Sequence, residues 1–281
     1  MKTMRRIVAD VKAAIQNNTE LTPLLWQLIC HSPQMPLWLP QKELLAKAET
    51  GSLKVFDQYF TQRELNFNYF IWGEGRRKIM LTHGWASKAA DFIELINALL
   101  TMDDVQVIAF DAPGNGKSEG ALSNLLLYVE AVKALLKHIG TPEVMIAHSL
   151  GAMANVIALN DLKVAPRQLI SITPLIRVKE NFKATMNSVG VPEEAQEAFF
   201  EDFRKRFDDH FSHFRLTTLY NFKGLPHFLA YDEEDHIAPF EYLQEFLSAH
   251  PDVKSKAYNG AGHDRILKNE EVIADVLSLL E

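Results

Sequence analysis

The stretch VMIAHSLGAMANVIA, at residues 144–158, decides the fold. It begins with a short apolar run that is typical of a buried strand, and the residues after Ser149 have the composition of a helix. Ala147, Ser149 and Gly151 follow the pattern small-x-Ser-x-Gly, which is typical of a nucleophilic serine on a sharp turn between a strand and a helix. Alanine replaces the glycine that is usual at the first small position, and its methyl group still fits there. The pattern predicts that the Ser149 hydroxyl projects above a sheet as a nucleophile.

Buried strands and helices alternate on both sides of this stretch. Short apolar runs between helical segments predict a parallel sheet that is covered by helices on both faces. Two earlier strands, near residues 53–60 and 65–71, show a period of two and are expected to form an antiparallel pair. The later strands are expected at 78–82, 105–110, 144–148, 168–173, 227–231 and 253–258, and the helices at 88–100, 123–139, 150–160, 239–249 and from 269.

The alternation stops over residues 174–224, which hold polar, charged and aromatic residues at helical spacing. We therefore predict a helical cap insertion there, with the α/β core formed by residues 53–173 and 225–281. Residues 1–52 are expected to form an N-terminal helical extension without catalytic residues. This extension packs against the main domain or mediates a contact between subunits, and the oligomeric state, monomer or dimer, stays open.

Two loops downstream of Ser149 supply candidates for a base and an acid, in the chain order expected for a serine site of this kind. His263 follows the last predicted strand, and the glycines on either side of Ala261 allow its loop to curl toward the serine. The acid is expected in the acidic loop after the strand at 227–231, where Asp235 is favoured and Asp232 is the competitor. A carboxylate there orients the histidine ring and stabilises its protonated form.

Acyl transfer also needs two backbone N–H donors for the oxyanion. We expect them at Leu150, directly after the nucleophile, and at Trp85, in the His-Gly-Trp loop after the strand at 78–82. Gly84, the Trp85 ring and His148 are predicted to contact the substrate. The nearby loop at 111–118 contains Gly-Lys-Ser, but it lacks the first glycine of a phosphate-binding loop. It is interpreted as a turn whose amides are held by Asp111.

The composition excludes several other classes of protein. The chain has 281 residues, 47% hydrophobic and 23% charged, with a net charge of −7, which gives no electrostatic reason to bind nucleic acid. Prolines interrupt the apolar residues 21–39, so no membrane span is expected. The single cysteine, Cys30, forms no intrachain disulfide and is expected to be a buried hydrophobe. Without an evident signal peptide, a cytoplasmic location is predicted.

No metal or cofactor is expected. His210 and His213 are three residues apart, but no carboxylate or cysteine completes a ligand set. The same segment holds an aromatic stripe that steps at helical spacing and consists of Phe200, Phe203, Phe207, Phe211 and Phe214. This stripe either packs the cap onto the main domain or forms part of the roof of an apolar acyl site.

Together these motifs resemble the α/β-hydrolase fold superfamily over about residues 53–281. The matching motifs are His83-Gly84-Trp85, Asp111-Ala112-Pro113-Gly114-x-Gly116-x-Ser118, His148-Ser149-Leu150-Gly151, Asp235 with its downstream proline, and Gly262-His263. The resemblance is to cap-bearing esterases, C–C bond hydrolases and thioesterases. It implies an eight-stranded, mostly parallel sheet, a helical cap inserted after strand six and hydrolysis without a metal. It assigns Ser149 as nucleophile, Asp235 as acid and His263 as base, with Trp85 and Leu150 as oxyanion donors.

Three functions are compatible with these residues. The favoured one is a serine hydrolase of small, mainly apolar esters or thioesters that works through an acyl-enzyme. A C–C bond hydrolase would use the same triad but needs a cationic or polar group for the substrate carboxylate, for which Arg177 is a candidate. The third is a non-enzymatic protein that keeps the fold and binds a small ligand. The fold alone does not decide between substrates.

Overall fold

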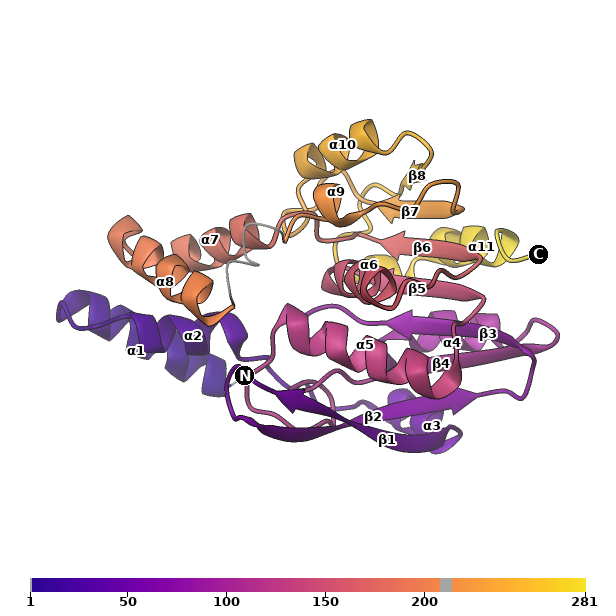
Figure 1. The fold of residues 1–281 in the computed structure, drawn as a ribbon, viewed down its shortest axis with the longest axis horizontal. Coiled ribbons are helices and arrows are strands. Elements are labelled where there is room, and N and C mark those ends of the chain that lie inside the picture. Colours follow the sequence, from indigo (N-terminus) through magenta and orange to yellow (C-terminus); the bar gives the residue numbers. More distant parts are fainter. Residues whose placement is uncertain (1, 208–213) are drawn as a thin grey trace.

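The structure, a computed structural model, describes residues 2–207 and 214–281 and contains one eight-stranded sheet (Figure 1). The strand order is β1-β2-β4-β3-β5-β6-β7-β8. From β4 to β8 in this order, β3 included, all neighbouring strands are parallel, whereas β2 is antiparallel to both β1 and β4. The strands are β1 (Glu49–Asp57), β2 (Arg63–Trp72), β3 (Arg77–Thr82), β4 (Val105–Phe110), β5 (Val144–His148), β6 (Gln168–Ile172), β7 (His227–Tyr231) and β8 (Lys254–Ala257).

Helices cover both faces of this sheet. In Figure 1, α5 and α6 cross in front of the strands, while α3, α4 and α11 lie behind them. Buried side chains accordingly form two hydrophobic cores, one on each face. The helices are α1 (Lys2–Gln16), α2 (Thr22–Cys30), α3 (Leu39–Ala46), η1 (Ala89–Phe92), α4 (Ile93–Leu99), α5 (Leu125–Ile139), α6 (Leu150–Leu162), α7 (Val178–Ser188), α8 (Glu193–Arg206), α9 (Leu216–Leu219), α10 (Phe240–Ala249), η3 (Arg265–Lys268) and α11 (Glu270–Ser278).

The predicted α/β fold with a mostly parallel eight-stranded sheet and flanking helices is therefore confirmed. Local chemistry explains several helix boundaries. Asn124 begins α5 as its N-cap, because its side chain accepts a hydrogen bond from the Leu127 N–H at 3.0 Å. Asn269 caps α11 in the same way through the Val272 N–H. Gly140 ends α5 with a φ of 80°, a conformation that glycine adopts without steric cost.

The first strand differs from the prediction. It begins at Glu49 rather than near residue 53, and it ends at Asp57, so Tyr59 and Phe60 lie in the following turn. The buried Asp57 carboxylate causes this early end, because it accepts hydrogen bonds from the N–H groups of both aromatic residues at 3.1 and 3.0 Å. The sheet thus begins within the segment that was predicted to be an N-terminal extension.

Helices from two separate parts of the chain gather at the carboxyl ends of the parallel strands (Figure 1). Helices α1 and α2 precede the sheet, and α7 and α8 lie between β6 and β7. Helix α2 contacts both α7 and α8. Sites in open α/β sheets form at this end of the strands, and Ser149 directly follows β5 there. In the described part of the chain, no helix has the length and apolar character needed to cross a membrane.

Candidate active site

Ser149 lies on a strained turn between β5 and α6. Its backbone has φ 50° and ψ −120°, a conformation that residues other than glycine rarely adopt. The turn brings α6 close to β3, and a Cβ added to Gly151 would lie 2.5 Å from the Thr82 carbonyl oxygen. Glycine is therefore required two residues after the serine. Ala147 is 2% exposed and pairs with Thr82 in the sheet, so a methyl group fits at the position where glycine is more usual.

A chain of hydrogen bonds joins the predicted nucleophile, base and acid. The His263 Nε2 lies 2.9 Å from the Ser149 Oγ, and its Nδ1 lies 2.6 Å from Asp235 Oδ2. The His263 and Asp235 side chains are 9% and 2% exposed, respectively. With the carboxylate accepting from Nδ1–H, Nε2 is left as the acceptor for the serine proton. This is the hydrogen-bond order of a serine nucleophile with a histidine base.

The two competing acids have different partners. Asp235 contacts the histidine through Oδ2, and its Oδ1 accepts hydrogen bonds from the N–H groups of Ile237 and Ala238 at 2.8 and 3.1 Å. Asp232 instead accepts from the Gly262 N–H at 2.6 Å and does not contact the imidazole. Asp232 therefore fixes the loop that carries His263, while Asp235 orients the ring.

The environment of Asp235 keeps it ionised. Burial alone raises the pKa of a carboxyl group, but the hydrogen bond and charge interaction with His263 and the two backbone N–H groups lower it, and the net pKa of Asp235 is lowered. A carboxylate that is ionised at neutral pH favours the imidazolium that forms when His263 takes up a proton.

The expected oxyanion donors are the N–H groups of Trp85 and Leu150. Both residues line the same pocket as Ser149. Gly84 brings the Trp85 loop close to the serine, because a Cβ on Gly84 would lie 3.0 Å from the Ser149 Cβ. Leu150 is the first residue of α6, where the helix has positive partial charge.

Two buried side chains fix the peptide between Gly84 and Trp85. The Gly84 carbonyl oxygen accepts hydrogen bonds from the His83 Nδ1–H at 2.7 Å and from the Tyr128 hydroxyl at 2.9 Å. The Nε2 atom of His83 accepts from the Ala112 N–H at 3.0 Å, which leaves the proton on Nδ1. The carbonyl and N–H of a trans peptide point in opposite directions, so this clamp directs the Trp85 N–H away from Tyr128.

His148 is 2% exposed and lines the pocket, and its Nε2 donates a hydrogen bond to the His263 carbonyl oxygen at 2.9 Å. Burial and the nearby His263 lower the pKa of His148 to about 3, so its ring is neutral. Gly84, predicted to contact substrate, does not line the pocket. A Cβ added there would meet the His148 Nδ1 at 2.8 Å and the Ser149 Cβ at 3.0 Å.

Other buried ionisable groups support the loops around the site. Asp111 accepts hydrogen bonds from the Ala89 and Lys117 N–H groups at 2.8 and 3.0 Å, as predicted, and burial raises its pKa to about 6. Burial lowers the pKa of His83 to about 4. On β7, burial together with the nearby His250 lowers the pKa of His227 to about 3. All three histidines with lowered pKa values, at positions 83, 148 and 227, are neutral at pH 7.

The pocket above Ser149 has a volume of about 410 Å³ and a mainly apolar lining. It is lined from the N-terminal helices by Met4, Leu28, Ile29 and Cys30, from the loop after α2 by Pro33, and from α7 by Val178, Asn181, Phe182 and Thr185. Among the described residues, no lysine or arginine lines it, and Asp264 is the one acidic residue of its lining. This lining suits an uncharged ligand.

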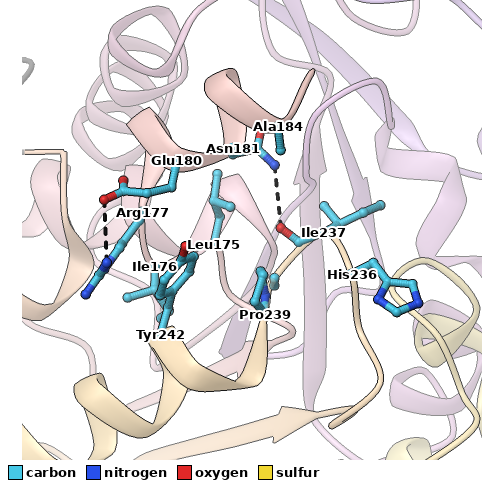
Figure 2. A pocket seen from close by; sticks show the side chains of 11 residues that line it. Leu175, Ile176, Arg177, Glu180, Asn181, Ala184, His236, Ile237, Pro239 and Tyr242 are labelled. Carbon is cyan, nitrogen blue, oxygen red and sulfur yellow. Dashed lines mark hydrogen bonds and ion pairs between the residues drawn. The ribbon is translucent and has the colours of Figure 1, made fainter. Parts of the chain in front are cut away.

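A smaller cavity of about 80 Å³ lies next to this pocket and shares Leu175, Asn181 and Ile237 with it. Figure 2 shows its lining, with the Asn181 amide directed at the Ile237 carbonyl oxygen, 3.5 Å away. Arg177 lines this smaller cavity and not the pocket of Ser149, and its guanidinium is paired with Glu180 and Glu245. The arginine considered for a substrate carboxylate is thus engaged elsewhere.

The aromatic stripe was predicted to lie on one helix, and this prediction is wrong. Helix α8 ends at Arg206, Phe211 lies outside the described residues, and Phe214 follows in a later segment. The described members are buried, and Phe203 stacks on Trp26 of α2 at a ring distance of 5.3 Å. None of these described members lines the pocket of Ser149. Phe203 and Phe207 therefore pack the C-terminal end of α8 against Trp26 of α2.

The remaining candidates concern metal and thiol chemistry. His210 and His213 lie outside the described residues. His148, His263 and Asp264 bring possible donor atoms within 4.8 Å of one another. Both ring nitrogens of His263 already contact Asp235 and Ser149, which suits acid–base chemistry better than metal ligation. Cys30 is 1% exposed and burial raises the pKa of its thiol, as expected for a buried hydrophobe.

Sequence reasoning missed Tyr128 and the pocket-lining residues of the N-terminal helices. Tyr128 lies within α5 among apolar residues and carries no motif. Leu28 and Ile29 belong to an apolar run that is compatible with simple packing. Only the folded arrangement brings these residues to the site.

Comparison with known proteins agrees with this architecture. Residues 79–276, well over half of the chain, match the model of the alpha/beta hydrolase family, and the chain belongs to that family. No curated protein matches the sequence at a significant level.

Several solved structures share the fold at low identity. An esterase from Pyrococcus furiosus is 22% identical, over 90% of this chain and 97% of that chain, with a TM-score of 0.63. A thermophilic esterase from Thermogutta terrifontis is 17% identical, over 82% of this chain and 98% of that chain, with a TM-score of 0.59. Alpha/beta hydrolase domain-containing protein 10 from mouse is 17% identical, over 82% of this chain and 96% of that chain, with a TM-score of 0.60.

Proposed function

We propose that this protein is a serine hydrolase that cleaves small, mainly apolar, uncharged carboxylic esters or thioesters through an acyl-enzyme. The observation that carries the proposal is the pair of short contacts from His263, 2.9 Å to Ser149 and 2.6 Å to Asp235. These contacts supply a base and its orienting acid to a serine on a strained turn. The strand-end location and the apolar pocket around the serine support the same function.

In the proposed reaction, the Ser149 Oγ attacks the substrate carbonyl carbon while His263 Nε2 takes up the hydroxyl proton. The carbonyl oxygen becomes an oxyanion and accepts hydrogen bonds from the Trp85 and Leu150 N–H groups. His263 then gives its proton to the departing alcohol or thiol as the bond to the carbonyl carbon breaks. Water, deprotonated by the same histidine, hydrolyses the acyl-enzyme and restores the serine.

The pocket lining favours this function over the alternative C–C bond hydrolase. That reaction calls for a cationic or polar group that binds a substrate carboxylate, and the described lining offers uncharged polar side chains but neither lysine nor arginine. Carboxylic esters are suitable first substrates, since the similar structures from Pyrococcus furiosus and Thermogutta terrifontis are both named esterases. A protein that only binds a ligand has no need for the serine–histidine–aspartate hydrogen-bond chain.

Hydrolysis of p-nitrophenyl esters by the wild type and by Ser149→Ala tests the proposal. The wild type should release p-nitrophenol with an initial burst, because acylation precedes slower deacylation. Ser149→Ala should show no burst, and its rate of ester hydrolysis should be at least about 10³-fold lower than that of the wild type. If the wild type binds such esters without turnover, the binding function replaces the enzymatic one. Equal rates for the two proteins would also refute the proposal.

A further inference from the structure

We infer that helix α2 forms the wall of the acyl site and limits the length of the acyl group that the protein accepts. This inference rests on the proposed function and names a specificity determinant within it. Leu28, Ile29 and Cys30, at the C-terminal end of α2, line the pocket of Ser149 and are at most 5% exposed. They precede residues 79–276, the part of the chain that matches the family model.

The order of the strands separates the two ends of a bound ester. Ser149 follows β5, and His263 follows β8 on one side of it in the sheet. Helix α2 lies toward the opposite side, because the Cys30 carbonyl oxygen accepts a hydrogen bond at 2.8 Å from the N–H of Ser123, in the loop after β4. The pocket therefore extends from the serine in two directions.

The chemistry assigns one direction to each half of the ester. His263 must reach the leaving oxygen to protonate it, so the alcohol lies on the side of His263, with Ile237 and α7. The acyl group then extends away from His263, toward Trp85 and the residues of α2. Its length is limited by Leu28 and Ile29.

Contacts with α8 hold this wall in place. The Trp26 Nε1–H donates a hydrogen bond to the Asp202 carboxylate at 2.7 Å, and the indole stacks on Phe203 with an interplanar angle of 11°. The Arg206 guanidinium lies 4.5 Å above the same indole. Helix α2 also packs against α1. A wall fixed by these contacts does not move aside for a longer chain, so removing atoms from it should change specificity.

The test compares Leu28→Ala with a matched control, Leu25→Ala. Both leucines are buried on α2, but Leu25 does not line the pocket. The substrates are p-nitrophenyl esters of increasing acyl length, and acetate esters of increasing alcohol length. Leu28→Ala removes three carbon atoms from the wall and should move the optimal acyl chain to longer esters. The value of kcat/KM for esters beyond the wild-type optimum should rise about fourfold per accommodated methylene.

The control and the alcohol series decide the outcome. Leu25→Ala should keep the wild-type acyl profile, and Leu28→Ala should keep the wild-type alcohol profile. An unchanged acyl profile in Leu28→Ala, an equal shift in Leu25→Ala, or a shift in the alcohol series overturns the inference. Leu28→Val, which removes one carbon, should shift the profile less and replaces Leu28→Ala if that variant does not fold. A wild type that turns over no ester refutes the proposed function itself, whereas turnover with unchanged profiles refutes this inference alone.

Discussion

The clamp on the Gly84 carbonyl leads to a quantitative prediction for Tyr128→Phe. This change removes one of two hydrogen bonds, the 2.9 Å bond from the hydroxyl, and leaves the 2.7 Å bond from His83. A single hydrogen bond contributes about 0.5–1.5 kcal/mol net, which corresponds to about 2- to 13-fold in rate if all of it is expressed in the transition state. Loss of a whole oxyanion donor costs about 10²–10³ in kcat, which sets the upper limit.

We therefore expect kcat to fall by roughly tenfold in Tyr128→Phe while KM stays near the wild-type value, because the Trp85 N–H would act on the oxyanion and not on the ground-state ester. The affinity for a boronic acid transition-state analogue should fall by the same factor. Tyr69→Phe is a matched control, since its hydroxyl also contacts a neighbouring side chain, His138, at 3.0 Å, outside the pocket. An unchanged kcat, or a raised KM with unchanged kcat, would refute the positioning role of Tyr128.

Three further predictions concern the turn, the acids and pH. Gly151→Ala should lower the free energy of unfolding in urea by about 1–3 kcal/mol, because its Cβ would lie 2.5 Å from a carbonyl oxygen, and a change below about 0.5 kcal/mol would contradict the contact. Asp235→Asn should lower kcat by about 10⁴, and Asp232→Asn by at most about 10², so equal losses in kinetic assays would reject the assignment of the acid. Acidification from pH 6.5 to 4 should destabilise the protein, because the three buried neutral histidines bind protons only on unfolding. The free energy of unfolding should fall by up to about 4 kcal/mol per pH unit from the three histidines together. Asp111, whose pKa is raised in the folded state, opposes this by about 1.4 kcal/mol per unit between its unfolded and folded values. His227→Gln should make the urea-measured slope shallower by about 1.4 kcal/mol per unit, whereas stability that is constant over this range would disprove the linkage.

The nucleophile turn could be predicted from sequence because its requirements are local. A buried strand, a serine and a glycine two residues later lie within a few positions of one another, and Gly151 is needed for a contact with the adjacent strand β3. That His263 lies close to Ser149 could also be predicted, because His263 follows the last strand of the sheet. The sequence favoured Asp235 over Asp232 but left Asp232 open as a competitor. Both acids belong to one loop, and only the folded loop directs one to the imidazole and the other to Gly262.

The N-terminal wall of the pocket was not predicted, for a different physical reason. Residues 1–52 were expected to be helical, and Pro23 lies in the first turn of α2, where proline is tolerated. No motif in this segment indicated that its apolar residues face the site. Periodicity also identified the aromatic stripe without indicating where its helix ends. The packing of Phe203 on Trp26 joins residues far apart in sequence, and no local pattern encodes that contact.

The central claim, that Ser149 is an activated nucleophile, is tested most directly by covalent labelling with a fluorophosphonate and mass spectrometry of the labelled peptide. The account predicts one adduct on the peptide that contains Ser149 in the wild type, none in Ser149→Ala, and much slower labelling in His263→Gln. Failure of the folded wild type to be labelled, or an adduct on another residue that persists in Ser149→Ala, would contradict it.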